Sequence, residues 1–279
     1  MRKFVGDDRP EEQIREHYEL EKRLATLLRN AGREERRQLY GQVYDKLYSS
    51  LPHHPRHRCS ESPALRMARV EMQIEILRPF LKREMVAVEL GPGTCHTLCA
   101  VAGKVNRALG VDVSVMATNR QNFPPNLELL QFDGINIPIP AESADLVYSM
   151  AVMEHLHPED ALEQLESVVK VLKPGGKYIF NTTHRFRGPD DISRHFDKVA
   201  TGFHLHEYTF RELGRLGRKA GFKKVYGLPR FLGRYYQTGP TALILFEALL
   251  APLPYGIRHW LANARGISSI LGVRAVAVK

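Results

Sequence analysis

The central part of the chain alternates short apolar runs with stretches of helical spacing, from residue 86 to residue 228. Short uninterrupted apolar runs are typical of strands buried in a parallel sheet. They predict strands at residues 86–90, 108–112, 127–132, 144–150, 178–181 and 222–228. Helices are predicted between them at residues 94–106 and 158–172, and after Thr209, which forms a capping box with Glu212. This order of elements predicts a single α/β unit.

The segment before this unit is charged and has the periodicity of helices over residues 10–50. Tyr40, Tyr44 and Tyr48 recur four residues apart and form an apolar stripe on one helix face. The stripe can pack on the domain or contact a substrate, and a helical lid would allow both. A further helix is predicted at residues 63–82.

Residues 229–268 separate the unit from its last predicted strand, at residues 270–279. Residues 241–253 are strongly apolar, but such a helix is too short to cross a bilayer, which takes about twenty residues. This helix can pack on the domain, form a dimer contact or lie at a membrane surface, so we expect a monomer or homodimer and keep peripheral membrane contact open. Four arginines flank the helix: Arg230, Arg234, Arg258 and Arg265.

The first predicted strand ends in a carboxylate and two glycines, Glu89, Gly91 and Gly93. Glycine at such a turn lets a ligand approach the backbone, because it has no Cβ. A dinucleotide-binding turn would carry a third glycine three residues later, where this chain has His96. Asp112 ends the next strand about twenty residues on, where a carboxylate can accept hydrogen bonds from both hydroxyls of a ribose.

The stretch from Glu89 to Gly93 resembles the E-x-G-x-G motif of class I S-adenosylmethionine-dependent methyltransferases. The Leu-Lys-Pro-Gly-Gly run at residues 172–176 and the segment after the fourth strand are similar to later motifs of that family. The resemblance implies S-adenosylmethionine as cofactor, with Asp133 meeting the exocyclic amine of adenine. The cofactor-binding residues expected are Glu89, Gly91, Gly93, Asp112, Val113, Asp133, Gly134, Met150 and His155.

The same resemblance implies the fold class. It is an α/β fold with a seven-stranded Rossmann-like methyltransferase sheet, whose last strand is antiparallel. We expect residues 1–82 to form an N-terminal helical lid and residues 83–279 to form the methyltransferase domain. A helical insertion is expected at about residues 229–268, before the last strand.

Composition and charge limit the partners that the chain can have. With 43% hydrophobic and 25% charged residues, it can bury a full core as an ordinary globular protein. The net charge is +9, and the excess lies in residues 211–279, where twelve Lys or Arg face only Glu212 and Glu247. This basic end can be a solvated face, or it can attract nucleic acid, anionic lipid or an anionic substrate.

The cysteines and the beginning of the chain bear on the cellular compartment. Cys59, Cys95 and Cys99 are an odd number and predict packed thiols in a reducing compartment. The first residues turn acidic before any apolar run develops, so no secretory peptide is expected. Both observations favour a cytoplasmic location.

The acceptor is expected beyond the carboxyl ends of the strands. Residues 182–208, after the fifth strand, are poor in apolar side chains and rich in ionisable ones, as functional loops often are. A hydroxyl acceptor needs a base, and imidazole titrates near neutral pH. The catalytic candidates are His155, His184 and His204, and the substrate-binding candidates are Arg185, Asp190, His195 and Tyr208. The ionisable residues of this loop lack a compact ligand spacing, so no metal is expected.

These features predict an enzyme that transfers a methyl group to oxygen or nitrogen of a small-molecule metabolite. The alternatives are an RNA or protein methyltransferase and a non-catalytic protein that binds S-adenosylmethionine. The sequence has no recognisable RNA-binding module, and residues 151–154 read Ala-Val-Met-Glu where an N-P-P-Y tetrapeptide would favour the macromolecular alternative. We therefore expect a small-molecule acceptor rather than nucleic acid.

Overall fold

The computed structural model of the chain describes residues 7–55, 62–114 and 123–279. Cys59, one of the three predicted packed thiols, lies outside these ranges. The strands of the main sheet are β1 (Val86–Leu90), β2 (Arg107–Asp112), β3 (Leu127–Gln131), β4 (Ala144–Met150), β5 (Leu172–Thr182), β6 (Lys224–Gly227) and β9 (Val273–Val278). The larger helices are α1 (Glu11–Asn30), α2 (Arg33–Ser50), α3 (Pro63–Leu77), α4 (His96–Ala102), α5 (Pro158–Val171), α6 (Phe210–Lys219), α7 (Pro240–Leu250), α8 (Tyr255–Asn263) and α9 (Ile267–Leu271).

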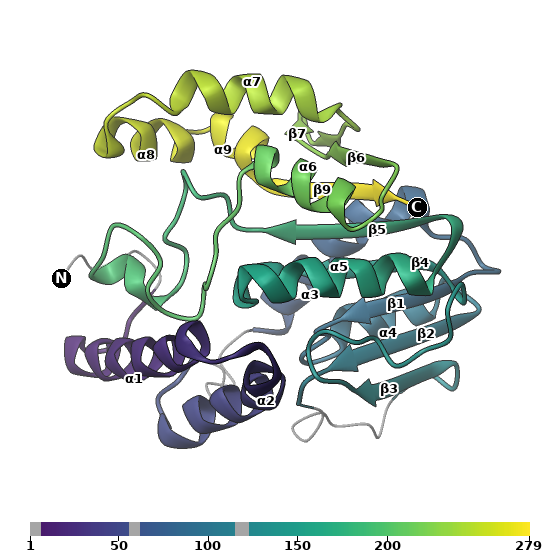
Figure 1. Ribbon diagram of the computed structural model, residues 1–279, viewed down its shortest axis with the longest axis horizontal. Coiled ribbons are helices and arrows are strands. Elements are labelled where there is room, and N and C mark those ends of the chain that lie inside the picture. Colours follow the sequence, from purple (N-terminus) through teal and green to yellow (C-terminus); the bar gives the residue numbers. More distant parts are fainter. Residues whose placement is uncertain (1–6, 56–61, 115–122) are drawn as a thin grey trace.

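The described residues build one seven-stranded sheet in the order β3-β2-β1-β4-β5-β9-β6 (Figure 1). Strands β1 to β5 pair in parallel, whereas β9 is antiparallel to both β5 and β6. The predicted methyltransferase sheet with an antiparallel last strand is therefore confirmed. Parallel strands present their carboxyl ends at one edge, and in Figure 1 the arrowheads point to the side where α1 and α2 lie.

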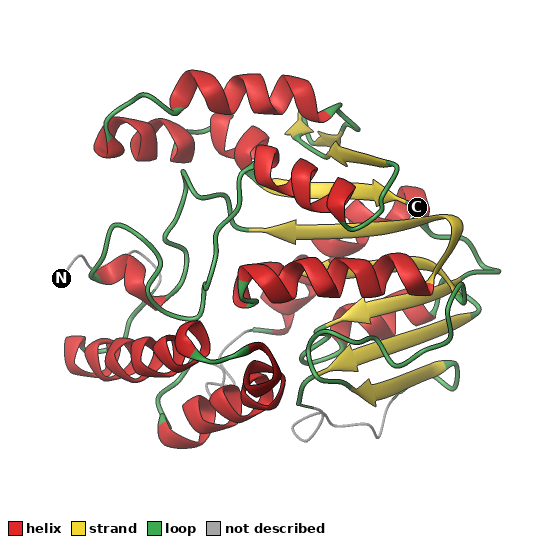
Figure 2. Cartoon of the chain, in the orientation of Figure 1, coloured by secondary structure: helices red, strands yellow, loops and turns green. Residues whose placement is uncertain are grey.

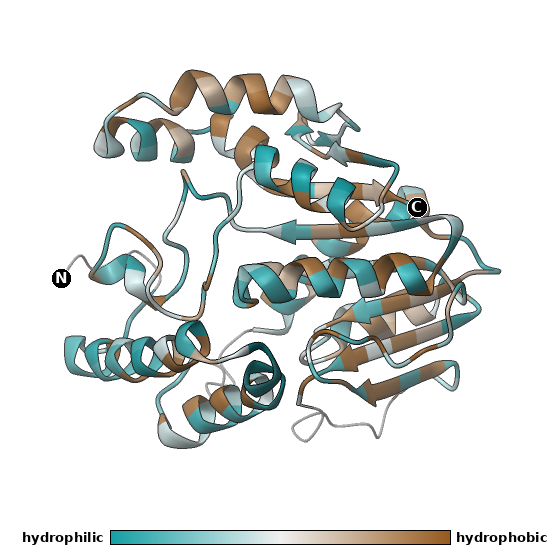
Figure 3. Ribbon diagram, viewed as in Figure 1, coloured by the Kyte–Doolittle hydropathy of each residue, from teal (hydrophilic) through white to brown (hydrophobic). Residues whose placement is uncertain are grey.

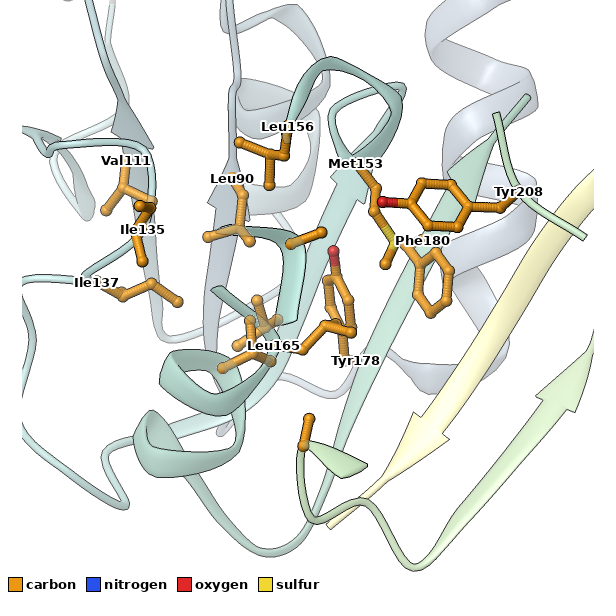
Figure 4. Close-up of a cluster of buried hydrophobic side chains, with 14 of the residues drawn as sticks. Leu90, Val111, Ile135, Ile137, Met153, Leu156, Leu165, Tyr178, Phe180 and Tyr208 are labelled. Atoms are coloured by element: carbon orange, nitrogen blue, oxygen red, sulfur yellow. The ribbon is translucent and has the colours of Figure 1, made fainter. Parts of the chain in front are cut away.

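Two apolar clusters, one on each face, hold helices against the sheet (Figure 2). Val88 and Leu90 of β1 face the cluster formed with α5 and α6, while Ala87, the residue before Val88, faces the cluster formed with α3 and α4. This alternation follows from the two-residue period of a strand. Figure 4 shows part of the first cluster, where Leu165 of α5 and Tyr178 of β5 lie together.

The fifth strand begins earlier than its sequence predicts. We expected Lys173, Pro174 and the two glycines after them to separate helix and strand, but β5 begins at Leu172, directly after α5 ends. Leu172 already pairs with Ala144 of β4, and the register shifts before Leu146. The shift lets this turn bulge out of a strand that continues on both sides of it.

The N-terminal helices are fastened to the sheet layer by a buried ion pair. The Arg36 guanidinium of α2 donates to both carboxylate oxygens of Asp160 in α5, at 2.6 and 2.7 Å. The Tyr40 hydroxyl donates to the same carboxylate at 2.6 Å. The Asp160 side chain is fully buried and that of Arg36 is 3% exposed. The second helix is therefore held in one position over the domain.

The segment between β6 and β9 is more elaborate than the single helix predicted. A short hairpin, β7 (Arg230–Phe231) and β8 (Arg234–Tyr235), precedes three helices, α7 to α9. Figure 3 shows the apolar character of α7, whose Leu245 and Leu249 are exposed, as is Trp260 of α8. Among the described residues, no helix is both long and apolar enough to cross a membrane.

We predict that Asp160→Asn destabilises the protein by about 3–5 kcal/mol, because it removes the buried counter-charge of Arg36. The remaining partner of Arg36 is the Glu159 carboxylate at 2.8 Å, whose side chain is 55% exposed and therefore compensates poorly. Urea unfolding would measure this loss. Glu128→Gln is the matched control, because it breaks an ion pair with Arg107 of similar length, 2.6 Å, whose side chains are about half exposed. That variant should lose less than about 1 kcal/mol. Equal losses in the two variants would contradict the anchoring role of Asp160.

Candidate functional site

A cavity of about 210 Å³ lies where β1, β2 and β4 end, beneath α2. We call it the β1 cavity. The three tyrosines predicted as an apolar stripe on α2 line one wall, and the turns that follow the strands line the others. The lining residues are Tyr40, Tyr44, Tyr48, Gly91, Gly93, Asp112, Val113, Ser114, Phe132, Gly134, Ala151, Val152, His155, Leu156 and Gln164.

Glycines let the backbone form the floor of this cavity. Gly91 has a φ of 64°, and a Cβ there would lie 2.8 Å from a methyl group of Val152. Gly134 has a φ of 89°, and a Cβ there would lie 3.2 Å from the ring of Tyr40. Among the residues that the structure describes, none has an atom within 4 Å of a Cβ placed at Gly93, so no side chain at this lining residue keeps a ligand from the backbone.

Asp112 lies at the end of β2 with its carboxylate on the cavity wall. One oxygen accepts from the backbone N–H of Gly93 at 3.1 Å, and the other accepts from that of Ser114 at 3.2 Å. Two N–H donors hold the carboxylate in place, and each oxygen keeps a further lone pair for a ligand. The group can accept hydrogen bonds from a diol, as the sequence predicts.

The side chain of Asp133 is engaged in its own turn. It follows the lining residue Phe132, but its carboxylate accepts from the backbone N–H groups of Ile135 at 2.8 Å and Asn136 at 2.6 Å. This geometry positions the backbone of Gly134 on the cavity wall. The predicted contact between Asp133 and adenine stays a prediction.

Glu89 lies beneath the glycine turn, is 4% exposed, and does not line the cavity. Burial raises the pKa of its carboxyl group to about 8, a hydrogen bond from Tyr148 opposes the shift, and the charge of Asp112 adds to it. Met150, also predicted as a cofactor residue, packs against the apolar cluster around α3 and α4. The other predicted cofactor residues, Gly91, Gly93, Asp112, Val113, Gly134 and His155, line the cavity together.

Sequence reasoning missed several lining residues. Ser114 and Phe132 lie beside predicted residues, so a wider window around each motif would have found them. Nothing in the sequence indicated that Gln164 lines the cavity, because it resembles any polar residue on the surface of a helix. Its side-chain amide donates to the Gly134 carbonyl at 2.7 Å and braces the turn on the cavity wall.

The candidate histidines His155 and His204 have different protonation states. His155 lines the β1 cavity, and its Nδ1 lies 3.0 Å from the Phe203 carbonyl. Since a carbonyl only accepts, Nδ1 carries the proton and Nε2 of the neutral ring has a free lone pair. Burial, and next the charge of His204, lower the pKa of His155 below its ordinary value. His155 is therefore neutral at physiological pH.

His204 and His184 have partners that use their ring nitrogens. Burial opposes a charge on His204, but the hydrogen bond to Glu207 and nearby carboxylates outweigh it and raise its pKa to about 9. In His184, Nδ1 accepts from the Phe186 N–H at 3.0 Å, so Nε2 donates to Glu247 at 2.8 Å. Glu247 also accepts from the backbone at the start of α6. Neither histidine lines the β1 cavity.

The four predicted substrate-binding residues are not gathered at one site. Arg185 is exposed and pairs with Glu212 at 2.7 Å. His195 is buried, with its Nε2 3.6 Å from a carboxylate oxygen of Asp7. Tyr208 lies in the apolar core beside Met153 and Phe180 (Figure 4). Asp190 lines a further cavity at the ends of β4 and β5, whereas Arg185 and Tyr208 line two other cavities.

Glu154, His155 and His204 offer possible metal-ligand atoms within 4.8 Å of one another. The Glu154 carboxylate accepts from the Thr182 hydroxyl at 2.8 Å, and the Nδ1 of each histidine is already hydrogen-bonded. The raised pKa of His204 keeps its imidazole protonated, and a protonated imidazole cannot bind a metal. We assign no metal to this cluster.

Comparison with known proteins shows which families this chain is similar to. Residues 88–180 match the family model described as a methyltransferase domain. A probable S-adenosylmethionine-dependent methyltransferase of Mycolicibacterium smegmatis is 28% identical over 49% of this chain and 51% of its own length. A malonyl-[acyl-carrier protein] O-methyltransferase of Marinomonas is 28% identical over 46% of this chain and 48% of its own length. The chain thus spans about half the length of the curated relatives it matches.

Solved structures share the fold at low sequence identity. A Haloferax volcanii methyltransferase in complex with the Trm112 methyltransferase activator has a TM-score of 0.51 and 18% identity, covering 77% of this chain and 94% of its own. A Haemonchus contortus phosphoethanolamine N-methyltransferase, solved with phosphoethanolamine and S-adenosylhomocysteine, has a TM-score of 0.51 and 16% identity. It covers 66% of this chain and 40% of its own.

The fold and the match over residues 88–180 agree with the predicted resemblance. These residues match a methyltransferase domain, and the sheet has the strand order and antiparallel last strand expected for class I S-adenosylmethionine-dependent methyltransferases. S-adenosylmethionine is the cofactor of this chain, and the bare Gly93 backbone beside the Asp112 carboxylate fits an uncharged ribose better than a pyrophosphate.

We predict that Glu89→Gln flattens the dependence of stability on pH. The folded-state pKa of about 8 lies above the ordinary value of 4.5, so the unfolded chain loses this proton first. Wild-type stability should therefore fall as pH rises from 4.5 towards 8, and the two values set an upper limit of about 5 kcal/mol. Urea unfolding of both proteins at pH 5, 6.5 and 8 tests this. Parallel curves would contradict a neutral Glu89.

Proposed function

We propose that this protein transfers a methyl group from S-adenosylmethionine to oxygen or nitrogen of a small-molecule acceptor. The observation that carries the proposal is the β1 cavity, where the glycine turn, the Asp112 carboxylate and the neutral imidazole of His155 share one wall. Methyl transfer needs the acceptor aligned with a carbon that the sulfonium of the donor already activates. Alignment alone can lower such a barrier by about 7–11 kcal/mol.

In this proposal, different residues around the cavity bind different parts of the cofactor. Asp112 accepts from the ribose hydroxyls, and the apolar side chains of Val113, Phe132 and Leu156 surround the adenine. Their place on the cavity wall supports these roles. The donor supplies an activated methyl group when bound, so the chain itself has to orient the acceptor and take up its proton.

We propose His155 as the general base. Its neutral ring, with a proton on Nδ1 and a lone pair on Nε2, can accept a proton from a hydroxyl or an ammonium group. The cationic state of His204 and the engaged nitrogens of His184 favour positioning roles for those two residues.

We propose that α1 and α2 form a lid that excludes water from the β1 cavity. The aromatic ring of Tyr44 lies against His155 at 6.0 Å and against Phe203 at 4.7 Å between ring centroids. The Arg29 guanidinium of α1 donates to three carbonyls of the loop after β5, those of Thr201, Gly202 and His204. These hydrogen bonds join the lid to the loop after β5, where we expect the methyl acceptor. Closure of the lid over the donor would therefore also order this loop.

We predict that the protein binds S-adenosylhomocysteine, and that Asp112→Ala weakens this binding by about 1.5–3 kcal/mol through loss of a charged acceptor. Calorimetry with the 2′-deoxy analogue separates ribose contact from turn stability. The wild type should favour the hydroxylated ligand, whereas the variant should distinguish the two poorly. An unchanged preference in the variant would rule out ribose recognition by Asp112.

We predict that label from methyl-tritiated S-adenosylmethionine enters the low-molecular-weight fraction of a metabolite extract. His155→Gln should lower incorporation by about 10²–10⁴-fold, because the proton acceptor is lost, while S-adenosylhomocysteine still binds. Label that precipitates with RNA or protein would overturn the small-molecule proposal, and full activity of the variant would exclude His155 as the base.

A further inference from the structure

A second cavity, also of about 210 Å³, lies at the carboxyl ends of β4 and β5. Asn181 and Thr182 of β5 line one side of it, and Arg274 of β9 lines another. Arg187 reaches it from the loop after β5. We call it the arginine cavity. Ala151 lines both this cavity and the β1 cavity, so the two spaces adjoin at a single residue.

The two arginines present buried N–H groups that the protein does not satisfy. The Nε of Arg187 and the Nη1 of Arg274 are buried and have no hydrogen-bond partner among the residues that the structure describes. A buried donor without a partner costs about 1–3 kcal/mol, and more when it is charged. Burial lowers the pKa of Arg274, and the charges of Arg187 and Arg230 act in the same direction. An anion between the guanidinium groups could accept hydrogen bonds from these N–H groups. It would also neutralise the positive charge that burial disfavours.

The carboxylates around this cavity do not supply that anion. Asp190 is exposed, and its nearest cationic partner is Arg194, at 3.8 Å. Glu154 is 1% exposed and accepts from the hydroxyl of Thr182. On the Glu154 side of the cavity, a ligand could donate a hydrogen bond from an N–H or O–H group. On the arginine side, a ligand would need a negative charge.

The insertion between β6 and β9 builds this site. The ring of Tyr235 in β8 lies 5.5 Å from the guanidinium carbon of Arg274, and the Asn263 amide of α8 donates to the Arg187 carbonyl at 3.3 Å. Asn263 also lines the cavity. Both arginines are therefore held by residues that a minimal sheet would lack, and a preorganised guanidinium pair is suited to a carboxylate or a phosphate.

We propose that the arginine cavity binds the anionic group, carboxylate or phosphate, of the methyl acceptor. The acceptor then lies across Ala151, with its nucleophilic atom towards the β1 cavity. This inference rests on the proposed function, because it names the class of acceptor for the same site: a small molecule with an oxyanion at one end and a methylated hydroxyl or amine at the other.

The test titrates inorganic phosphate and, separately, acetate into the protein, with and without saturating S-adenosylhomocysteine. Sodium chloride at matched ionic strength is the reference, and the midpoint of thermal unfolding is the readout. We expect saturable stabilisation by at least one of the two anions, beyond that of chloride. Stronger binding of phosphate would identify a phosphate ester as acceptor, and stronger binding of acetate a carboxylic acid. No stabilisation beyond chloride would overturn the proposal.

Variants locate the anion. Arg274→Met and Arg187→Met should each weaken anion binding by about tenfold or more, and Arg274→Lys, which keeps the charge, should recover part of it. Arg265→Met is the matched control, because it removes one exposed charge from the same insertion. It should change affinity by less than about twofold, since salt screens a distant exposed charge. Equal losses in Arg274→Met and Arg265→Met would overturn the site.

The same samples separate the two proposals. S-adenosylhomocysteine affinity is measured for every variant, and unchanged values show that the fold and the β1 cavity are intact. Failure of the wild type to bind S-adenosylhomocysteine would contradict the proposed function. Normal binding of that ligand without anion binding would contradict only the arginine cavity.

Discussion

The buried contact of Arg36 and Tyr40 with Asp160 is the interaction on which the site depends, because it fixes α2 above the open end of the sheet. Without α2, the glycine turn and Asp112 would lie on a surface open to water. With it, three tyrosines close one wall of the β1 cavity. Removing one partner of a buried ion pair is strongly destabilising, so this contact suits the lid that we propose for α1 and α2.

The buried ionisable groups near the β1 cavity are not all in the same charge state. Glu89 beneath the glycine turn and His155 on the cavity wall are both neutral near pH 7, whereas His204 beside Glu207 is cationic. The rings of His155 and His204 lie 5.1 Å apart between centroids. The cation suppresses protonation of its neighbour, and His155 therefore keeps the lone pair that a base requires.

The insertion connects the basic C-terminal region with the proposed chemistry. Most arginines of residues 211–279 are exposed, but Arg274 is half-buried and lines the same cavity as Arg187 at the end of the sheet. The uneven charge of the sequence is compatible with an anionic small substrate, one of the readings it allowed. Tertiary packing decides which basic side chains line the arginine cavity, because it brings Arg274 of β9 next to the loop that carries Arg187.

The sequence alone determined the sheet, the glycine turn and Asp112, because these depend on local periodicity and on residues close together in the chain. It also indicated the tyrosine stripe and the loop after β5. Only the tertiary structure decided which residues meet. His184, His195 and Tyr208 carry the same side-chain chemistry as site residues, but packing buries them away from the β1 cavity. The contacts of Gln164 with Gly134 and of Arg36 with Asp160 join distant segments, and no spacing along the chain encodes them.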